Sequence, residues 1–158
     1  FTRRQINIES LNVSSSSNKG VHKYTITCST DEQTVKNVVK QIEKITDVIQ
    51  AHYFTDDDIF LQEIALYKLS TPEFTGCPMA SKVIRRYNAH VVEVNPVFSI
   101  VVLSGMSEEI TSVFEQLQEL GCVLQFVRSG RIAITTSCFE HVNEFLETRK
   151  QKYEESKQ

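Results

Sequence analysis

The sequence lacks any large excess of charge of one sign. Its 17 basic and 20 acidic residues give a net charge of −3, so there is no broad cationic surface for a nucleic-acid backbone or an anionic membrane. No apolar run approaches the roughly 18 to 20 residues of a membrane-spanning helix, and the first residues have no signal-peptide architecture. With 158 residues, 41% of them hydrophobic, the chain is long enough for one ordinary domain or two small ones. We therefore expect a soluble, folded protein with neither nucleic acid nor membrane as a partner.

The sequence also lacks a C-x-x-C pair. The four cysteines, Cys28, Cys77, Cys122 and Cys138, are widely separated and have mostly apolar or strand-forming neighbours. This spacing matches neither a redox motif nor a zinc site. We interpret the four residues as reduced, buried thiols of a cytoplasmic protein.

No catalytic motif is present. Glycine-rich phosphate loops and G-x-S-x-G are missing, and no two histidines stand four residues apart. A metal site could join His90 to Cys77 or His52, but a structural or surface role is the better interpretation. A helix dipole could lower the pKa of Cys77, although helix capping beside Pro78 is favoured. The aspartates at 56–58 lack the spaced ligands of a calcium loop and predict a solvated linker.

What the sequence does contain is an internal repeat, with a spacing of about 75 residues between Val35 and Ile110. In the first copy, strands at 6–13 and 21–28 flank a Ser-rich loop at 14–20. A capping box of Thr30 and Gln33 precedes an amphipathic helix at 35–45, and a strand follows at 48–53.

The second copy adds a strand at 60–69, a loop at 70–76 and a helix from Pro78 to Tyr87. Strands near 90–94 and 99–103, a helix at 110–120 and a strand from Val123 complete it. This β-α-β-β-α-β order predicts a four-stranded antiparallel sheet with two helices on one face, the ferredoxin-like arrangement.

The fold class is therefore α+β, with two ferredoxin-like units and a C-terminal helix. The expected limits are 1–55 for the first unit, 56–59 for a linker, 60–136 for the second unit and 137–158 for the helix and tail. A capping box of Ser137 and Glu140 starts that helix.

The first unit is expected to be incomplete. Residues 3–13 repeat the pattern of 84–94, where a strand and a helix come first. By analogy, a strand and most of a helix precede Phe1, and residues 1–5 form the last turn of that helix. Arg3 and Arg4 then complement a helix C-terminus, as Arg85 and Arg86 do; contact with a partner is the alternative for the first pair.

Asn7 is the candidate ligand-binding residue. It belongs to the expected strand at 6–13, although asparagine is a poor strand former, as is Asn12. A strand that contains asparagine can use the amide, which donates and accepts hydrogen bonds at once. Ligand binding and an ordinary core strand remain alternatives on this feature alone.

Four phrases, at residues 7–13, 40–49, 63–66 and 128–130, resemble the regulatory (small) subunit of acetolactate synthase, also called acetohydroxyacid synthase. The resemblance runs in order from residue 1 to about 136. It implies a first unit that is an ACT domain and a second domain of related fold, in agreement with the repeat.

The resemblance further implies a protein without an active site of its own. Such subunits activate a separate catalytic subunit, which carries thiamine diphosphate, magnesium and FAD, and they mediate feedback inhibition by valine or another branched-chain amino acid. The effector lies at an ACT dimer interface, and Asn7 and Ile8 match the second-strand position of that site. A homodimer and a cytoplasmic location are expected. The matching loop would fall before Phe1, and His22, Lys23 and Gln62 depart from the common pattern, which bears on effector identity.

Two other functions remain open. One is a stand-alone ACT-type amino-acid sensor acting on another enzyme or regulator, for which no basic helix-turn-helix segment is visible. The other is a small enzyme using Cys77 or a histidine, which turnover by the isolated chain would reveal.

Overall fold

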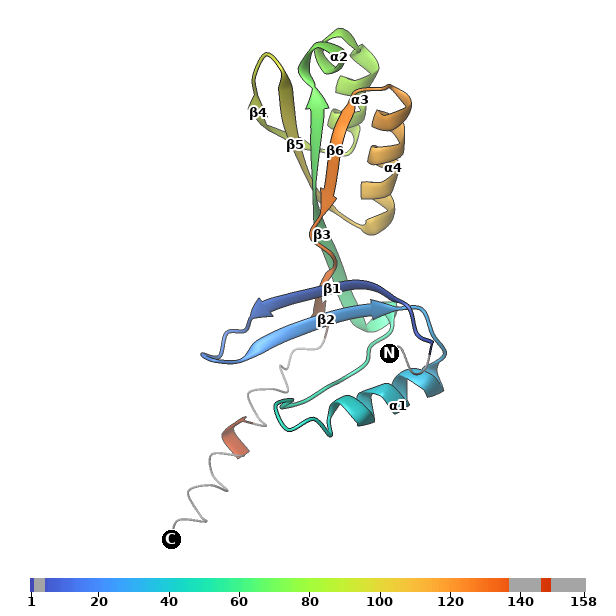
Figure 1. The fold of residues 1–158 in the computed structure, drawn as a ribbon, viewed down its shortest axis with the longest axis vertical. Helices are drawn as coiled ribbons and strands as arrows, with labels where there is room; N and C mark the ends of the chain where they lie inside the picture. Colours follow the sequence, from blue (N-terminus) through green and yellow to red (C-terminus); the bar gives the residue numbers. More distant parts are fainter. Residues whose placement is uncertain (2–4, 137–145, 149–158) are drawn as a thin grey trace. The chain divides into compact units, whose positions relative to one another are not determined.

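The computed structural model describes residues 1, 5–136 and 146–148. Figure 1 shows the arrangement of its strands and helices. The elements are β1 (Ile8–Ser15), β2 (His22–Cys28), α1 (Glu32–Ile42), a 3₁₀ turn (Asp56–Asp58), β3 (Ile59–Ser70), α2 (Thr71–Gly76), α3 (Pro78–Arg86), β4 (His90–Val94), β5 (Phe98–Gly105), α4 (Ser107–Glu119), β6 (Val123–Arg128) and β7 (Ile132–Thr135).

The chain forms two compact units that interleave along the sequence. One contains residues 1–7, 29–60 and the chain from Ile134 onward; the other contains residues 8–28 and 61–133. The β1–β2 hairpin therefore groups with the unit built on the long strand β3. The domain limits expected from the sequence stay a prediction.

The β3 unit has the predicted ferredoxin-like topology. Its strands lie in the order β4-β5-β3-β6, all pairs being antiparallel, and β7 also pairs with β3. Helices α3 and α4 cover one face of this sheet (Figure 1). The predicted α+β fold class is thus confirmed. Two details differ: the loop expected at 70–76 contains the short helix α2, and β7 was not expected.

Alternation along β3 creates the core of this unit. Ala65, Tyr67 and Leu69 are fully buried because every second side chain of a strand points to the same face. Leu117 of α4 is also fully buried, and the ring of Phe126 stacks on Tyr67 with centroids 5.1 Å apart. The sheet face that the helices cover is therefore the hydrophobic core.

Tyr67 carries the main polar group of this core. Its hydroxyl donates to the carbonyl of Ile110 at 2.9 Å, and burial, assisted by the Glu63 carboxylate and opposed by Arg128, raises its pKa well above the usual range. An unfolded tyrosine loses its proton near pH 10, so above that pH the folded state binds more protons than the unfolded state.

Tyr67→Phe should therefore change the alkaline stability profile. We expect it to lower the free energy of unfolding by about 1 kcal/mol at pH 7, through the lost hydrogen bond. It should also reduce the fall in stability that wild type shows as the pH rises above about 10. Urea unfolding at pH 7 and above pH 10 measures both effects. Tyr24→Phe, at an exposed position, is the control, and an unchanged alkaline slope in Tyr67→Phe would contradict this assignment.

Three segments share the same backbone closure. In each, a residue with positive φ is followed by a buried residue whose N–H bonds to the carbonyl five positions earlier; after α3 and α4 this is the Schellman arrangement of a helix end. The residues with positive φ are Gln5 at 55°, Asn88 at 54° and Gly121 at 72°. The bonds are Ile6 N to Phe1 O (3.3 Å), Ala89 N to Ile84 O (2.9 Å) and Cys122 N to Leu117 O (3.4 Å).

The N-cap of helix α1 lies one residue later than the capping box in the sequence predicts. Asp31, rather than Thr30, is the N-cap, and its carboxylate accepts from the Thr34 backbone N–H at 2.8 Å. Hydrogen bonding by the Thr34 side chain, and then by its backbone N–H, lowers the pKa of Asp31. The prediction from Thr30 and Gln33 was wrong because an aspartate next to a threonine caps at least as well.

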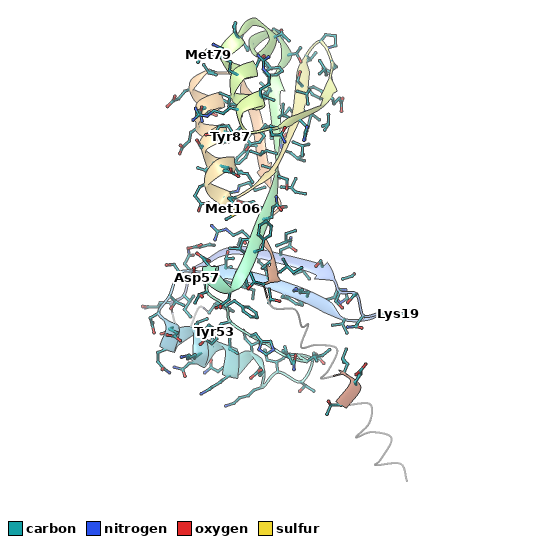
Figure 2. The ribbon with its side chains drawn as sticks, turned by 180° about the vertical axis from the view of Figure 1, so that it is seen from behind. Lys19, Tyr53, Asp57, Met79, Tyr87 and Met106 are labelled. Carbon is teal, nitrogen blue, oxygen red and sulfur yellow. The ribbon has the colours of Figure 1, made fainter. Side chains whose placement is uncertain are left out.

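The strand expected at 48–53 does not form. These residues have no regular secondary structure and run back beside α1 in Figure 1. Tyr53, labelled in Figure 2, donates its hydroxyl to Glu32 at 3.2 Å, and Lys36, which pairs with Glu32, lies 5.8 Å from the Tyr53 ring centroid. Side-chain contacts to the helix thus hold this segment.

Other expectations fall outside the described residues. They are the pair Arg3–Arg4, Cys138 and most of the C-terminal helix, of which residues 146–148 are described and are helical. No helix in the described part of the chain has the length and hydropathy needed to cross a membrane.

Candidate functional site

Asn7 and Ile8 lie where the chain enters β1. The strand begins at Ile8, so Asn7 is just outside it, which corrects the expected strand at 6–13. Both side chains are exposed, and Ile8 pairs with Cys28 of β2. Burial and the nearby Glu9 carboxylate raise the pKa of the Cys28 thiol, so Cys28 stays protonated and apolar beside Ile8.

A bulge follows directly in β1. The register shifts between Ile8, which faces Cys28, and Ser10, which faces Thr27. Glu9 is the extra residue, and a bulge of this kind redirects side chains. Ser10 and Asn12 then share one face of the strand and are partly buried, whereas Leu11 between them is exposed.

The turn between β6 and β7, Ser129 to Arg131, lies against that face of β1. The backbone N–H of Arg131 donates to the Ser10 hydroxyl at 3.2 Å, and the Asn12 amide donates to the Ser129 carbonyl at 3.3 Å. The Arg131 guanidinium lies 3.7 Å from the Glu9 carboxylate. Asn12 thus uses its amide for a structural contact.

The same turn is anchored in the C-terminal sheet. The Ser129 N–H donates to the carbonyl of Ile64 at 2.9 Å, and the Ile64 N–H donates to the Ser129 hydroxyl at 3.0 Å. Gly130 has a φ of 78°, which favours glycine because side chains strain this conformation. The turn is therefore fixed on its β3 side.

Arg128, at the end of β6, is the most highly connected side chain of this region. Its guanidinium donates through two nitrogens to the carboxylate of Glu63, which is 3% exposed. It also donates to the hydroxyls of Ser107 and Thr111 on α4. The pair neutralises a carboxylate that would otherwise be buried without a partner.

The sheet face opposite the helices carries exposed apolar side chains. Ile64 and Leu66 of β3 and Val127 of β6 are 47%, 45% and 49% exposed, and Leu66 pairs directly with Val127. Single exposed apolar residues are normal on a protein surface. Adjacent exposed apolar residues on one sheet face instead form an apolar patch.

The other candidate residues are dispersed. No group of three or more His, Cys, Asp or Glu residues that could hold a metal occurs in the described part of the chain. Cys77 is the N-cap residue of α3, beside Pro78 as favoured from the sequence, but its side chain makes no capping hydrogen bond there. It packs instead against the core. Asp58 caps a 3₁₀ turn by accepting from Thr55.

The chain matches two family models. Residues 62–137 match "Small subunit of acetolactate synthase" and residues 1–50 match "AHAS small subunit-like ACT domain". The acetolactate synthase small subunit of Bacillus subtilis is 30% identical over 134 residues, which are 84% of this chain and 77% of that protein. The chain belongs to the acetolactate synthase small-subunit family.

A second relative agrees with this family, and a solved structure agrees with the fold. The acetolactate synthase small subunit of Buchnera aphidicola is 25% identical over 134 residues, 85% of this chain and 84% of that protein. The crystal structure of the small subunit from Thermotoga maritima superposes with a TM-score of 0.77 at 20% identity, covering 88% of this chain and 86% of that one. The resemblance found in the sequence is confirmed, and the chain is a regulatory subunit of acetolactate synthase.

The candidate residues around the start of β1 come partly from the sequence and partly from the structure. Asn7 and Ile8 were found from the sequence, whereas the contacts of Ser10 and Arg131 were not. The available signal was the phrase at 128–130, quoted for its resemblance without a structural role. Its partners lie about 120 residues away, as the contact from Arg131 to Ser10 shows.

Proposed function

We propose that this chain activates the catalytic subunit of acetolactate synthase and mediates feedback inhibition by a branched-chain amino acid such as valine. Family membership supports the regulatory role. The exposed start of β1 supports an effector site at Asn7 and Ile8, and it is the observation on which the site depends.

The chemistry of β1 suits an aliphatic amino acid. Within the described residues, β1 pairs with β2 alone, so its outer edge presents backbone N–H and C=O groups. Those groups can bind the carboxylate and ammonium of an amino acid, and the Asn7 amide can bridge them. The exposed Ile8 side chain offers apolar contact to a branched aliphatic group.

The proposed assembly is a complex with the catalytic subunit in the cytoplasm. That subunit, and not this chain, is expected to carry thiamine diphosphate, magnesium and FAD. We propose a homodimer in which a second copy completes the effector site, because an unpaired strand edge is a natural pairing surface. Neither nucleic acid nor membrane is a proposed partner.

Asn7→Ala tests the effector site. In the complex of full-length protein with the catalytic subunit, we expect unchanged activation without effector and valine inhibition weakened by roughly tenfold. That loss corresponds to about 1.4 kcal/mol, near the upper end of about 0.5 to 1.5 kcal/mol for a typical hydrogen bond. Acetolactate formation across a valine titration measures the change.

Ser15→Ala is the matched control, because Ser15 is an exposed residue at the other end of β1. It should leave the valine titration unchanged. Normal valine sensitivity in the Asn7→Ala complex would show that Asn7 has no part in binding.

A further inference from the structure

We propose that the turn from Ser129 to Arg131 transmits the feedback signal from β1 to the C-terminal sheet, with Arg131 as the positioning residue on the β1 side. This inference rests on the proposed function, since it requires an effector at the start of β1. It adds a route from that site to the remainder of the β3 unit.

The β1 side of the route begins at the bulge. Glu9 is the bulged residue between Ile8 and Ser10, so any change in the backbone of Ile8 must alter the positions of Glu9 and Ser10. Both of these residues contact Arg131, Glu9 through its carboxylate and Ser10 through its hydroxyl. A bulge disrupts the strand ladder only locally, so a backbone change confined to it leaves the other strand pairs in place.

The sheet side of the route is rigid. Ser129 exchanges two hydrogen bonds with Ile64, and Arg128, its chain neighbour, is paired with the buried Glu63 and bonded to α4. A displacement of the turn therefore acts on β3, β6 and α4 together. Packed elements of this kind respond as units and do not deform continuously.

The β1 contacts of the turn are suited to signalling more than to stability. The Arg131 and Glu9 side chains are 28% and 41% exposed, and ion pairs of that exposure add little to folding stability. The contacts nevertheless join segments about 120 residues apart in sequence, as Ser10 and Arg131 show. Their removal should separate the effector response from the fold.

The test uses the full chain with its catalytic subunit and three variants. Arg131→Met removes the ion pair while keeping an unbranched apolar stem, Ser10→Ala removes the hydrogen bond, and the double variant removes both. Arg85→Met, at an exposed position near the end of α3, is the control. The measurements are activation without valine, residual activity at saturating valine, valine binding by calorimetry, and thermal unfolding.

We expect the double variant to activate within twofold of wild type, bind valine and unfold at the same temperature. Its inhibition by saturating valine should be at least about fivefold weaker, the lower end of typical coupling between sites. Glu9→Gln should weaken inhibition as much as Arg131→Met does alone and have no further effect in the Arg131→Met background, because both changes remove the same ion pair.

Two results would overturn the signalling proposal and leave the proposed function intact. One is full inhibition of the double variant by saturating valine. The other is loss of valine binding together with loss of inhibition, which would make the turn part of the binding site. If wild type itself is neither activating nor sensitive to any branched-chain amino acid, the proposed function fails and this inference fails with it. The wild-type arm separates the two cases.

Discussion

Arg128→Ala should destabilise the protein by about 3 to 5 kcal/mol, because it leaves the buried carboxylate of Glu63 without its counter-charge. Glu63 is 3% exposed and receives both of its charge-assisted hydrogen bonds from Arg128. Small domains have about 5 to 15 kcal/mol of stability in total, so the variant should be close to unfolded at 37 °C. Urea unfolding should show a midpoint lowered by roughly 2 M.

A second substitution separates charge burial from packing. Glu63→Leu in the Arg128→Ala background should recover most of the lost stability, because removing both charges also removes the penalty of leaving one unpaired. Arg85→Ala, at an exposed helix end, should change the free energy of unfolding by less than about 1 kcal/mol. Equal instability in the single and double variants would refute the buried-charge explanation.

Leu117→Ala should have an effect of similar size by a different mechanism. Leu117 of α4 is fully buried in the core cluster, and its truncation removes apolar contacts and leaves a cavity. Such substitutions cost about 2 to 5 kcal/mol, depending on how far the core collapses around the vacancy. The midpoint of urea unfolding, with an unchanged slope, measures the loss.

Leu124→Ala is the matched control in the same unit. Leu124 is 56% exposed on β6, so the same chemical change there should cost less than about 1 kcal/mol. If both leucine variants were equally unstable, the assignment of the core to the helix-covered face would be wrong.

The second unit could be predicted from the sequence because its signals are local. Alternation in 60–69 and helical spacing in 110–120 each identify one buried face, and β3 and α4 follow them closely. The order of these elements then allows few topologies, of which the ferredoxin-like sheet is the common one.

The segment at 48–53 could not be predicted because strand propensity depends on a partner strand. Its residues have strand-forming side chains, but Tyr53 is held to Glu32 of α1 instead. The whole fold determines whether a neighbouring strand is available. The local sequence pattern therefore cannot show whether this segment will form a strand. The end of β1 also differs from the expected one. It lies at Ser15, inside the Ser-rich stretch, because Ser14 and Ser15 pair with Lys23 and His22 of β2.

The candidate site was predictable in part. Asn7 was singled out because an asparagine is unusual in a strand, and Ile8 because of the family resemblance. The coupling contacts of Arg131 were not predictable, because they join residues about 120 positions apart and each uses an ordinary polar side chain. The sequence signal of that contact was a pair of polar residues on one face of β1, Ser10 and Asn12.

The most direct measurement of the central claim is acetolactate formation by the catalytic subunit with and without the full-length protein, in the presence and absence of valine, leucine and isoleucine. A regulatory subunit should raise the rate, and at least one of the three amino acids should lower it again. An unchanged rate on addition of the protein, with no response to any of the three, would contradict the account.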